Sequence, residues 1–238
     1  MISKDEYLSG QVLLIDKPLH WTSFQVVNKL RWEIRRAFKL KKIKVGHAGT
    51  LDPLATGLLV ICTGKMTKQI DTFQAQTKEY TGTITIGSTT PSFDLETEID
   101  NTFTTEHITE ALIHKTTEQF IGDIQQFPPV FSAIKKEGKR LYEFARAGED
   151  VDIKPRTVNI SAFEITKIDA STSLSNQSID IDFRVVCSKG TYIRSLANDF
   201  GKALHSGGHL SALRRTKIGD FNVADAISID AFISSLKS

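Results

Sequence analysis

A constrained loop with a single carboxylate is the segment of this chain best suited to chemistry. Residues 46–57 read GHAGTLDPLATG, and Asp52 stands between Leu51 and Pro53. Pro53 fixes its own φ and pushes the preceding residue toward extended backbone, so the carboxylate is held rather than mobile. Apolar neighbours remove water from the carboxylate, which strengthens it as a nucleophile but disfavours its charge unless a cation compensates. The same pattern also suits a plain Asp-Pro turn, so the loop alone leaves both interpretations open.

Several other motifs that carry chemistry are missing from the sequence. Gly64-Lys65 does not belong to a phosphate-binding loop, because Met66 stands where Ser or Thr is required. There is no dinucleotide fingerprint, no HExxH and no paired CxxC, and the six histidines are scattered. Cys62 and Cys187 lie alone in apolar surroundings. We therefore expect no metal and no cofactor, and we expect reduced cysteines in a cytosolic protein.

Basic residues are concentrated in three segments, although the net charge is only +2. The first segment holds one acid, Glu33, and eight basic residues: Lys29, Arg31, Arg35, Arg36, Lys39, Lys41, Lys42 and Lys44. The others hold Lys135, Lys136, Lys139 and Arg140, and Arg214, Arg215 and Lys217. Such clusters neutralise phosphates, which largely drives RNA binding. One cluster alone would suit a solvated helix face, but three clusters favour a nucleic-acid partner.

The overall composition is that of an ordinary globular protein. The 238 residues are 40% hydrophobic and 24% charged, and they suffice for one large domain or two small ones. The most apolar stretch, 58–62, is far shorter than the ~18 residues that a membrane helix needs. The N-terminus carries acids and lacks the apolar segment of a signal peptide. We expect a cytoplasmic monomer with no membrane association, and nothing in the composition implies a protein partner.

The pattern of apolar residues predicts strands and helices that do not alternate regularly. Helix 23–40 begins with a capping box, Thr22 to Gln25, and strand 178–187 alternates strictly between apolar and polar residues. Further strands are expected at 11–16, 78–87 and 210–218, and further helices at 105–119, 139–147, 192–204 and from Ser228 onward. This order favours an α+β domain over residues 1–238, with a central mixed, mostly antiparallel sheet and flanking helices. An RNA-binding cleft across one face of this domain is what the family resemblance given below implies.

The loop around Asp52 resembles the active-site signature of the TruB-type tRNA pseudouridine-55 synthases. The resemblance extends to five other segments in the order that the family has. They are 12–18 (VLLIDKP), 78–80 (KEY), 131–146 (FSAIKKEGKRLYEFAR), 187–194 (CSKGTYIR) and 213–215 (LRR). It implies a pseudouridine synthase fold, a tRNA T stem-loop as partner, and isomerisation of one uridine without cofactor or metal.

The resemblance also implies the residues that carry the reaction. Asp52 matches the nucleophile that attacks or traps the ribose after the target base has been flipped out of the RNA loop. Arg194 matches an arginine whose guanidinium can pair with that carboxylate and keep it ionised. Tyr80 matches a tyrosine that stacks on the uracil and whose hydroxyl is a candidate proton acceptor.

Five further positions match residues that contact or support the substrate. His47 matches the histidine that fills the space left by the flipped bases, and Lys17 matches a residue that supports the active-site loop. Tyr192, Ile193 and Leu213 match apolar residues that line the uracil pocket. For the RNA backbone we expect contacts from the basic segments, above all from Arg35, Arg36, Lys139, Arg140, Arg214 and Arg215.

The chain departs from the family pattern at two places. His20 stands where the N-terminal motif usually has Gly, so the local turn differs if that position needs a left-handed backbone. Asp94 matches an acid that the family has after the tyrosine strand, but the sequence leaves its role open. Only about twenty residues follow Ile218, too few for the small RNA-binding PUA domain of many members, and we expect that domain to be missing.

Two alternatives remain beside tRNA uridine isomerisation. A non-catalytic RNA-binding or RNA-folding module could use the same scaffold, although binding alone has no use for Asp52, Tyr80 and Arg194 together. An enzyme that isomerises uridine in ribosomal RNA would need the same pocket residues for uracil. Family resemblance alone separates it from the tRNA enzyme.

Overall fold

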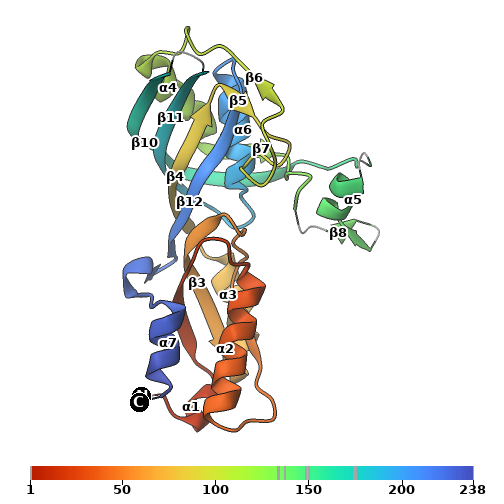
Figure 1. Ribbon diagram of the computed structural model, residues 1–238, viewed down its shortest axis with the longest axis vertical. Helices are drawn as coiled ribbons and strands as arrows, with labels where there is room; N and C mark the ends of the chain where they lie inside the picture. The colour runs from red at the N-terminus through yellow and green to blue at the C-terminus, as the bar shows by residue number, and fades with distance from the viewer. Residues whose placement is uncertain are drawn as a thin grey trace. The chain divides into compact units, whose positions relative to one another are not determined.

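The chain forms two compact units in the computed structural model, which describes residues 2–132, 135–136, 138–147, 149, 151–173 and 176–237 (Figure 1). The first unit is Met1–Tyr80 with Leu213–Ser238, and the second is Thr81–Ala212. The division falls inside two strands, β4 (Lys78–Ile86) and β12 (Gly208–Ile218), so each of them contributes residues to both units.

The first unit is built on strands that surround β3 (Ala55–Thr63). The apolar run 58–62 lies in this strand and is buried throughout. Antiparallel neighbours are β1 (Val12–Lys17) and β2 (Val45–His47), and β12 pairs with β3 in parallel. A short strand, β13 (Phe221–Asn222), pairs with the end of β12. The parallel pairing matters for function because it places Leu213, Arg214 and Arg215 beside Ala55, Thr56 and Gly57, directly after Asp52 in the chain.

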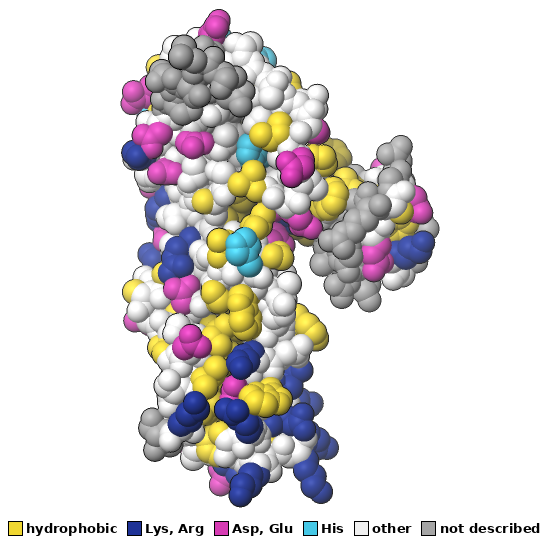
Figure 2. All heavy atoms as spheres, in the orientation of Figure 1, with side chains coloured by type: hydrophobic (Ala, Val, Ile, Leu, Met, Phe, Trp, Pro, Cys, Tyr) yellow, Lys and Arg dark blue, Asp and Glu magenta, His cyan; other side chains and the backbone are white. Residues whose placement is uncertain are grey.

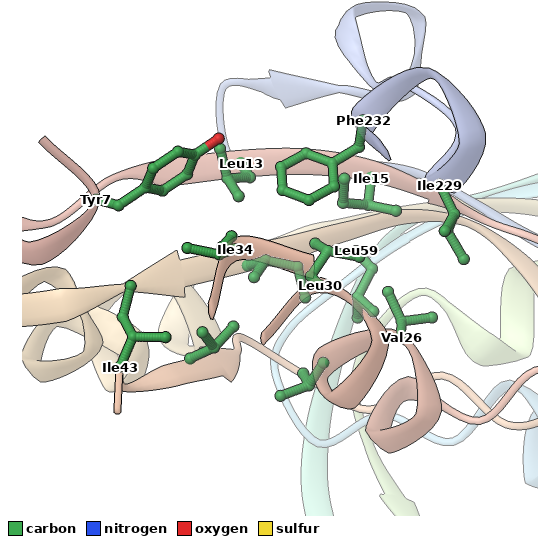
Figure 3. Packing of buried hydrophobic residues seen from close by; sticks show 13 residues of the cluster. Tyr7, Leu13, Ile15, Val26, Leu30, Ile34, Ile43, Leu59, Ile229 and Phe232 are labelled. Carbon is green, nitrogen blue, oxygen red and sulfur yellow. The ribbon is translucent and has the colours of Figure 1, made fainter. Parts of the chain in front are cut away.

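Helices cover these strands and bury the core of the first unit. They are α1 (Lys4–Ser9), α2 (Ser23–Ala37), α3 (Ile70–Ala75) and α7 (Ile229–Ser235), with 3-10 turns η1 (Gly64–Gln69) and η3 (Val223–Asp225). In Figure 3, side chains from α2, α7, β1 and β3 point toward one another, and the labelled residues are all buried. The Thr22 hydroxyl accepts from Gln25 N and the Gln25 side chain accepts from Thr22 N, which fixes the start of α2.

The second unit is a sheet with the strand order β12-β4-β11-β10-β7. Its long hairpin joins β10 (Arg156–Ser173) to β11 (Asn176–Cys187), and β7 (Gly122–Gln126) pairs antiparallel with β10. Two small hairpins pair β5 (Ser88–Thr89) with β6 (Asn101–Thr102), and β8 (Lys135–Lys136) with β9 (Lys139–Arg140). Its helices are α4 (Glu110–Thr117), α5 (Leu141–Ala147) and α6 (Ile193–Ala203), with the 3-10 turn η2 (Glu118–Phe120).

Aromatic side chains hold α6 against this sheet. The Phe163 ring lies 5.2 Å from that of Phe200 and 5.9 Å from that of Phe183, both with edge-on geometry. The rings thus fill space between strand and helix in the arrangement that aromatic pairs prefer. α4 and α6 lie side by side behind the strands (Figure 1). This packing holds α6, which carries Arg194 in its first turn, against the sheet.

Most of the expected elements are confirmed, and so is the mixed, mostly antiparallel α+β fold. The expected helix at 105–119 is shorter, because Thr109 caps it and α4 begins at Glu110. The expected helix at 139–147 begins at Leu141, and its expected stop, Gly148, lies outside the described residues. The 18-residue strand β10 was missed. Its two register shifts break the alternation that would have revealed it.

Two further expectations concern composition. Cys62 and Cys187 are both buried, as expected for core cysteines. Within the part of the chain that the structure describes, no helix is both long enough and apolar enough to cross a membrane.

The close approach of β3 and β12 predicts an unequal effect of two matched glycine substitutions. Gly57 has φ +100°, and a Cβ there would lie 2.3 Å from the backbone oxygen of Arg215. Gly122 has φ +92°, but no atom among the described residues lies within 4 Å of the same point. Gly122→Ala should lower the unfolding free energy by about 1–2 kcal/mol, the usual penalty of a left-handed backbone. Gly57→Ala should lower it by about 1–3 kcal/mol more, because the backbone must move.

Urea unfolding of both variants and the wild-type protein measures these losses. Equal losses at the two positions would contradict the close backbone contact at Gly57.

Candidate functional site

The loop that carries Asp52 is held by the beginning of α2. The Ser23 hydroxyl accepts a hydrogen bond from Leu51 N at 2.8 Å and donates one to Leu51 O at 3.1 Å, so both backbone groups before Asp52 are fixed. Ala55 N donates to Asp52 O at 3.1 Å and closes a turn over Pro53. The Asp52 side chain is partly buried. We define residues 48–54 as the Asp52 loop. These hydrogen bonds fix the backbone from which the Asp52 carboxylate extends.

His20 also anchors the Asp52 loop, in the left-handed conformation that the sequence comparison raised as a question. Its φ is +64°, and its backbone N–H donates to Pro53 O at 2.8 Å. The turn that usually contains Gly is therefore retained with a histidine, at the cost of some strain. The exposed imidazole of His20 leaves room for this substitution, because it has no core to disrupt.

Lys17 is a fully buried lysine whose ammonium group lies in the electric field of Asp52. Its Nζ donates to Trp21 O at 2.6 Å and to Pro18 O at 3.0 Å. Burial lowers the pKa of Lys17 to about 8; the nearby Asp52 carboxylate opposes this shift, and the Arg215 guanidinium adds to it. Lys17 thus fixes the turn that leads from β1 to α2, and its predicted role in supporting the Asp52 loop stays a prediction.

His47 stands at the end of β2, where the Asp52 loop begins. Burial lowers its pKa, the charge of Arg215 lowers it further, and a hydrogen bond with the Gly49 backbone acts in the opposite direction. Its Nδ1 is buried and has no hydrogen-bond partner among the described residues. The flat imidazole ring is suited to stacking on a base.

Tyr80 and Leu213 lie at the two points where the chain leaves and re-enters the first unit. Tyr80 is buried in β4, with 8% of its surface exposed. Leu213 is partly buried in β12 and pairs with Ala55 of β3. The first unit thus contains Asp52, Lys17, His47, Tyr80 and Leu213.

Arg194, the other residue predicted to act on the carboxylate, belongs to the second unit. It lies in the first turn of α6 and is 5% exposed. Its Nη2 donates to Phe131 O at 2.9 Å and its Nη1 donates to Ser92 O at 3.2 Å, while its Nε lies 3.5 Å from Asp94 Oδ2. Its predicted pairing with Asp52 joins different units and stays a prediction.

Asp94 thereby gains the role that the sequence left open. Its carboxylate is as deeply buried as the guanidinium of Arg194, and its second oxygen accepts from Glu96 N at 3.0 Å. Hydroxyl groups of Thr90 and Ser92 donate to Asp94 O at 2.6 and 3.0 Å. Asp94 is therefore held by its own loop, and it orients Arg194 by charge.

Gln126 is a site residue that sequence reasoning missed. Its side-chain oxygen accepts from Tyr192 N at 2.8 Å, and its side-chain nitrogen donates to Tyr192 O at 3.0 Å. This fully buried amide thus fixes Tyr192 and, through it, Ile193 at the start of α6. Arg156 lies over the Tyr192 ring, 5.9 Å from its centre. The one signal in the sequence is that Gln126 directly precedes Phe127-Pro128-Pro129, a run that favours extended backbone.

The basic residues expected at the RNA backbone lie in different surroundings. Arg214 makes a two-point ion pair with Asp16, at 3.0 and 2.7 Å, which neutralises it within the protein. Arg215 is only 1% exposed, so its guanidinium has no surface on which to meet a phosphate. Lys139 is exposed and its Nζ lies over the Phe144 ring, whereas the side chain of Arg140 is outside the described part of the structure.

Arg35 and Arg36 lie on the exposed side of α2. Arg36 contacts Glu33 at 2.7 Å and lies over the Trp32 ring, 4.5 Å from its centre. Lys29 contacts the other oxygen of Glu33 at 3.1 Å. Glu33 is nearly buried, so it holds two cations at the surface in fixed positions. Figure 2 shows lysine and arginine side chains gathered around α2 and the turn that follows it.

The arrangement can supply a nucleophilic carboxylate on a loop fixed by hydrogen bonds, with the ammonium group of Lys17 near it. Among the described residues, no three His, Cys, Asp or Glu side chains are grouped to hold a metal ion.

Comparison with known proteins assigns the whole chain to one family. Residues 35–193 match the model of the TruB family pseudouridylate synthase N-terminal domain, and residues 194–237 match that of the tRNA pseudouridylate synthase B C-terminal domain. A tRNA pseudouridine synthase B of Flavobacterium johnsoniae is 64% identical over 99% of this chain and 100% of its own length. One of Phocaeicola vulgatus is 55% identical over 95% of this chain and 93% of its own length.

Solved structures agree with the sequence relatives. The crystal structure of a Cbf5-Nop10-Gar1 complex contains a chain with 29% identity and a TM-score of 0.69. The match covers 96% of this chain and 54% of that one, so this chain spans about half of the solved protein. With family models over both parts of the sequence and relatives matched along their full length, the chain belongs to the TruB family of pseudouridylate synthases.

Proposed function

We propose that this protein is a tRNA pseudouridine synthase, an isomerase that converts uridine-55 in the T-arm loop of tRNAs into pseudouridine. The observation that carries the proposal is the Asp52 carboxylate on a loop fixed by Ser23, His20 and Ala55. It stands in a chain of the TruB family whose relatives are named tRNA pseudouridine synthase B.

The chemistry requires a nucleophile and a proton acceptor but no oxidant or reductant. The bond between ribose C1′ and uracil N1 breaks, and a bond between C1′ and C5 forms. The C5 carbon loses a proton and N1 gains one, so substrate and product are isomers. Asp52 attacks or traps the ribose. Because the loop is fixed by hydrogen bonds, the carboxylate loses little conformational freedom when it is positioned against C1′. The Tyr80 hydroxyl is the candidate acceptor of the C5 proton.

Arg194 is proposed to pair with Asp52 in the assembled site. The support is that its guanidinium is already oriented by two carbonyl oxygens and by Asp94, so little rotational freedom remains to be lost when it binds a carboxylate. A buried arginine in this state also opposes protonation of a nearby acid.

Substrate recognition is proposed to use the groups around the nucleophile. The target uridine must leave the RNA loop to reach the partly buried carboxylate of Asp52. The flat ring of His47 is proposed to fill the space that the base vacates. Tyr192, Ile193 and Leu213 are proposed to line the uracil pocket, and Gln126 keeps the first two in place.

The RNA backbone is proposed to contact the basic surface of α2, with Lys139 and Arg140 as further contacts. The support is that Glu33 holds Lys29 and Arg36 at the surface, where they need no large rearrangement to meet a phosphate. The two units are proposed to act as one catalytic domain, in a cytoplasmic monomer. tRNA is the only partner that the proposal requires.

The first prediction concerns the nucleophile. Asp52→Asn should abolish pseudouridine formation in transcribed tRNA, because a neutral amide cannot attack C1′ but preserves the shape of the side chain. The affinity for tRNA should stay within about tenfold of the wild-type value. Chemical mapping of pseudouridine after incubation, with a filter-binding measurement, tests both parts. A ribosomal RNA fragment incubated in parallel tests the alternative substrate. Near-normal turnover by the variant would show that Asp52 is not the nucleophile.

The second prediction concerns Arg194. Arg194→Lys should lower kcat by about a hundredfold, because one ammonium cannot meet two carbonyl oxygens and Asp94 at once. Asp94→Asn should lower kcat in the same direction, since the amide oxygen no longer attracts the guanidinium by charge. Activities per folded molecule are to be compared at a temperature where circular dichroism shows every variant folded. Wild-type activity of Arg194→Lys would show that the planar guanidinium has no part in the reaction.

The third prediction concerns the surface of α2. Replacing both Arg35 and Arg36 by Ala should flatten the salt dependence of tRNA binding by roughly 0.7–0.9 of a log–log slope unit for each lost phosphate contact. KM should rise and kcat should change little, because phosphate contacts position the RNA without touching the uracil. Lys167→Ala is the control, since this exposed lysine is paired with Asp169 on β10. Identical slopes for all three proteins would place the RNA elsewhere.

A further inference from the structure

Arg215 occupies a position unlike that of any other basic residue in its segment. It follows Arg214 in β12, but neighbouring residues of a strand point to opposite faces of the sheet. Arg214 therefore reaches Asp16 near the surface, while Arg215 is buried with 1% of its surface exposed. Its backbone lies beside Gly57 in the parallel pairing of β12 with β3.

The guanidinium of Arg215 joins the chain before Asp52 to the chain after it. Nε donates to Leu58 O at 2.8 Å, and Nη2 donates to Gly49 O at 3.1 Å. Gly49 comes three residues before Asp52 and Leu58 comes six residues after it. One planar side chain thus fixes the distance between the two ends of the segment that presents the carboxylate.

Two glycines make room for this contact. Gly49 has φ +101°, and a Cβ there would lie 3.4 Å from Arg215 Nη1, at the limit of tight packing. Gly57, with φ +100°, has no space for a Cβ beside the Arg215 backbone. At Gly57 the close approach to Arg215 thus requires that no side chain be present, whereas at Gly49 it is the positive φ that favours glycine.

The charge of Arg215 is not explained by packing. Among the described residues it pairs with no carboxylate, and both hydrogen bonds go to uncharged carbonyl oxygens. A buried cation without an anion is costly, so an apolar side chain would serve better if filling space were the only requirement. The charge acts on groups of the site, because it lowers the pKa of both Lys17 and His47.

We propose that Arg215 is a positioning residue for uridine isomerisation: it sets the geometry of the Asp52 loop by holding Gly49 O and Leu58 O with one guanidinium. This inference rests on the proposed function of the protein. Arg215 acts on the reaction through the loop and not by touching RNA, which its burial prevents.

The test compares Arg215→Met and Arg215→Lys with the wild-type protein. Arg215→Met keeps the bulk and removes both hydrogen bonds, and it should lower kcat by about a hundredfold, the effect of a displacement of roughly 1 Å at the reacting group. Arg215→Lys keeps the charge but reaches only one carbonyl oxygen, and it should recover part of the loss, to about tenfold below wild type. The tRNA dissociation constant should stay within about threefold for both variants.

The matched control is Arg184→Met. Arg184 also lies in a strand and is paired, with Glu164, but it is outside the proposed site. This variant should keep wild-type kcat. Single-turnover rates are to be measured per folded molecule, at a temperature where the unfolding curve of each variant is still on its folded baseline. If Arg215→Met does not fold, the partial loss in Arg215→Lys at unchanged tRNA affinity carries the test.

A folded Arg215→Met or Arg215→Lys with wild-type kcat would overturn the inference. So would a loss of rate fully explained by weaker tRNA binding, because that would mean a contact with RNA. Failure of the wild-type protein itself to form pseudouridine in tRNA would instead overturn the proposed function. The two failures are therefore distinguishable.

Discussion

The parallel pairing of β3 with β12 is the constraint on which the geometry of the first unit depends. It places a residue late in the chain, Arg215, beside the strand that follows Asp52, and it brings a buried guanidinium to Gly49 O and Leu58 O. Ser23 then fixes the loop from the side of α2. A carboxylate on a short loop would otherwise sample many positions. Here the backbone on both sides of it is held by groups that are themselves part of a helix or a strand.

The second unit also fixes the residues proposed to take part in the reaction by contacts within itself. Arg194 is held by Ser92, Phe131 and Asp94, and the residue two positions before it, Tyr192, is held by the buried amide of Gln126. These contacts lie at the start of α6, and farther along the helix Phe200 packs against the sheet. The proposed reaction thus draws on two sets of groups, each ordered within its own unit before the substrate arrives, which reduces what binding must organise.

Local signals in the sequence sufficed for the parts of the fold that depend on neighbours in the chain. The capping box at Thr22 and the alternation in strand 178–187 were read correctly, and the family resemblance supplied the proposed partners of Asp52. The contacts of Arg194 with Ser92 and of Gln126 with Tyr192 could not be predicted from the sequence. They join residues 102 and 66 positions apart, and neither contact produces a periodic pattern. Arg214 and Arg215 show a signal that was overlooked. Two adjacent arginines in a strand face opposite sides, so they could not both meet RNA.

The most direct test of the account is a map of pseudouridine at single-nucleotide resolution in tRNA and ribosomal RNA from cells that lack this protein. The account predicts that pseudouridine disappears at position 55 of tRNAs, that ribosomal RNA keeps all of its pseudouridines, and that the wild-type chain restores the tRNA modification when it is returned. Pseudouridine at position 55 in the deleted cells, or a loss confined to ribosomal RNA, would contradict it.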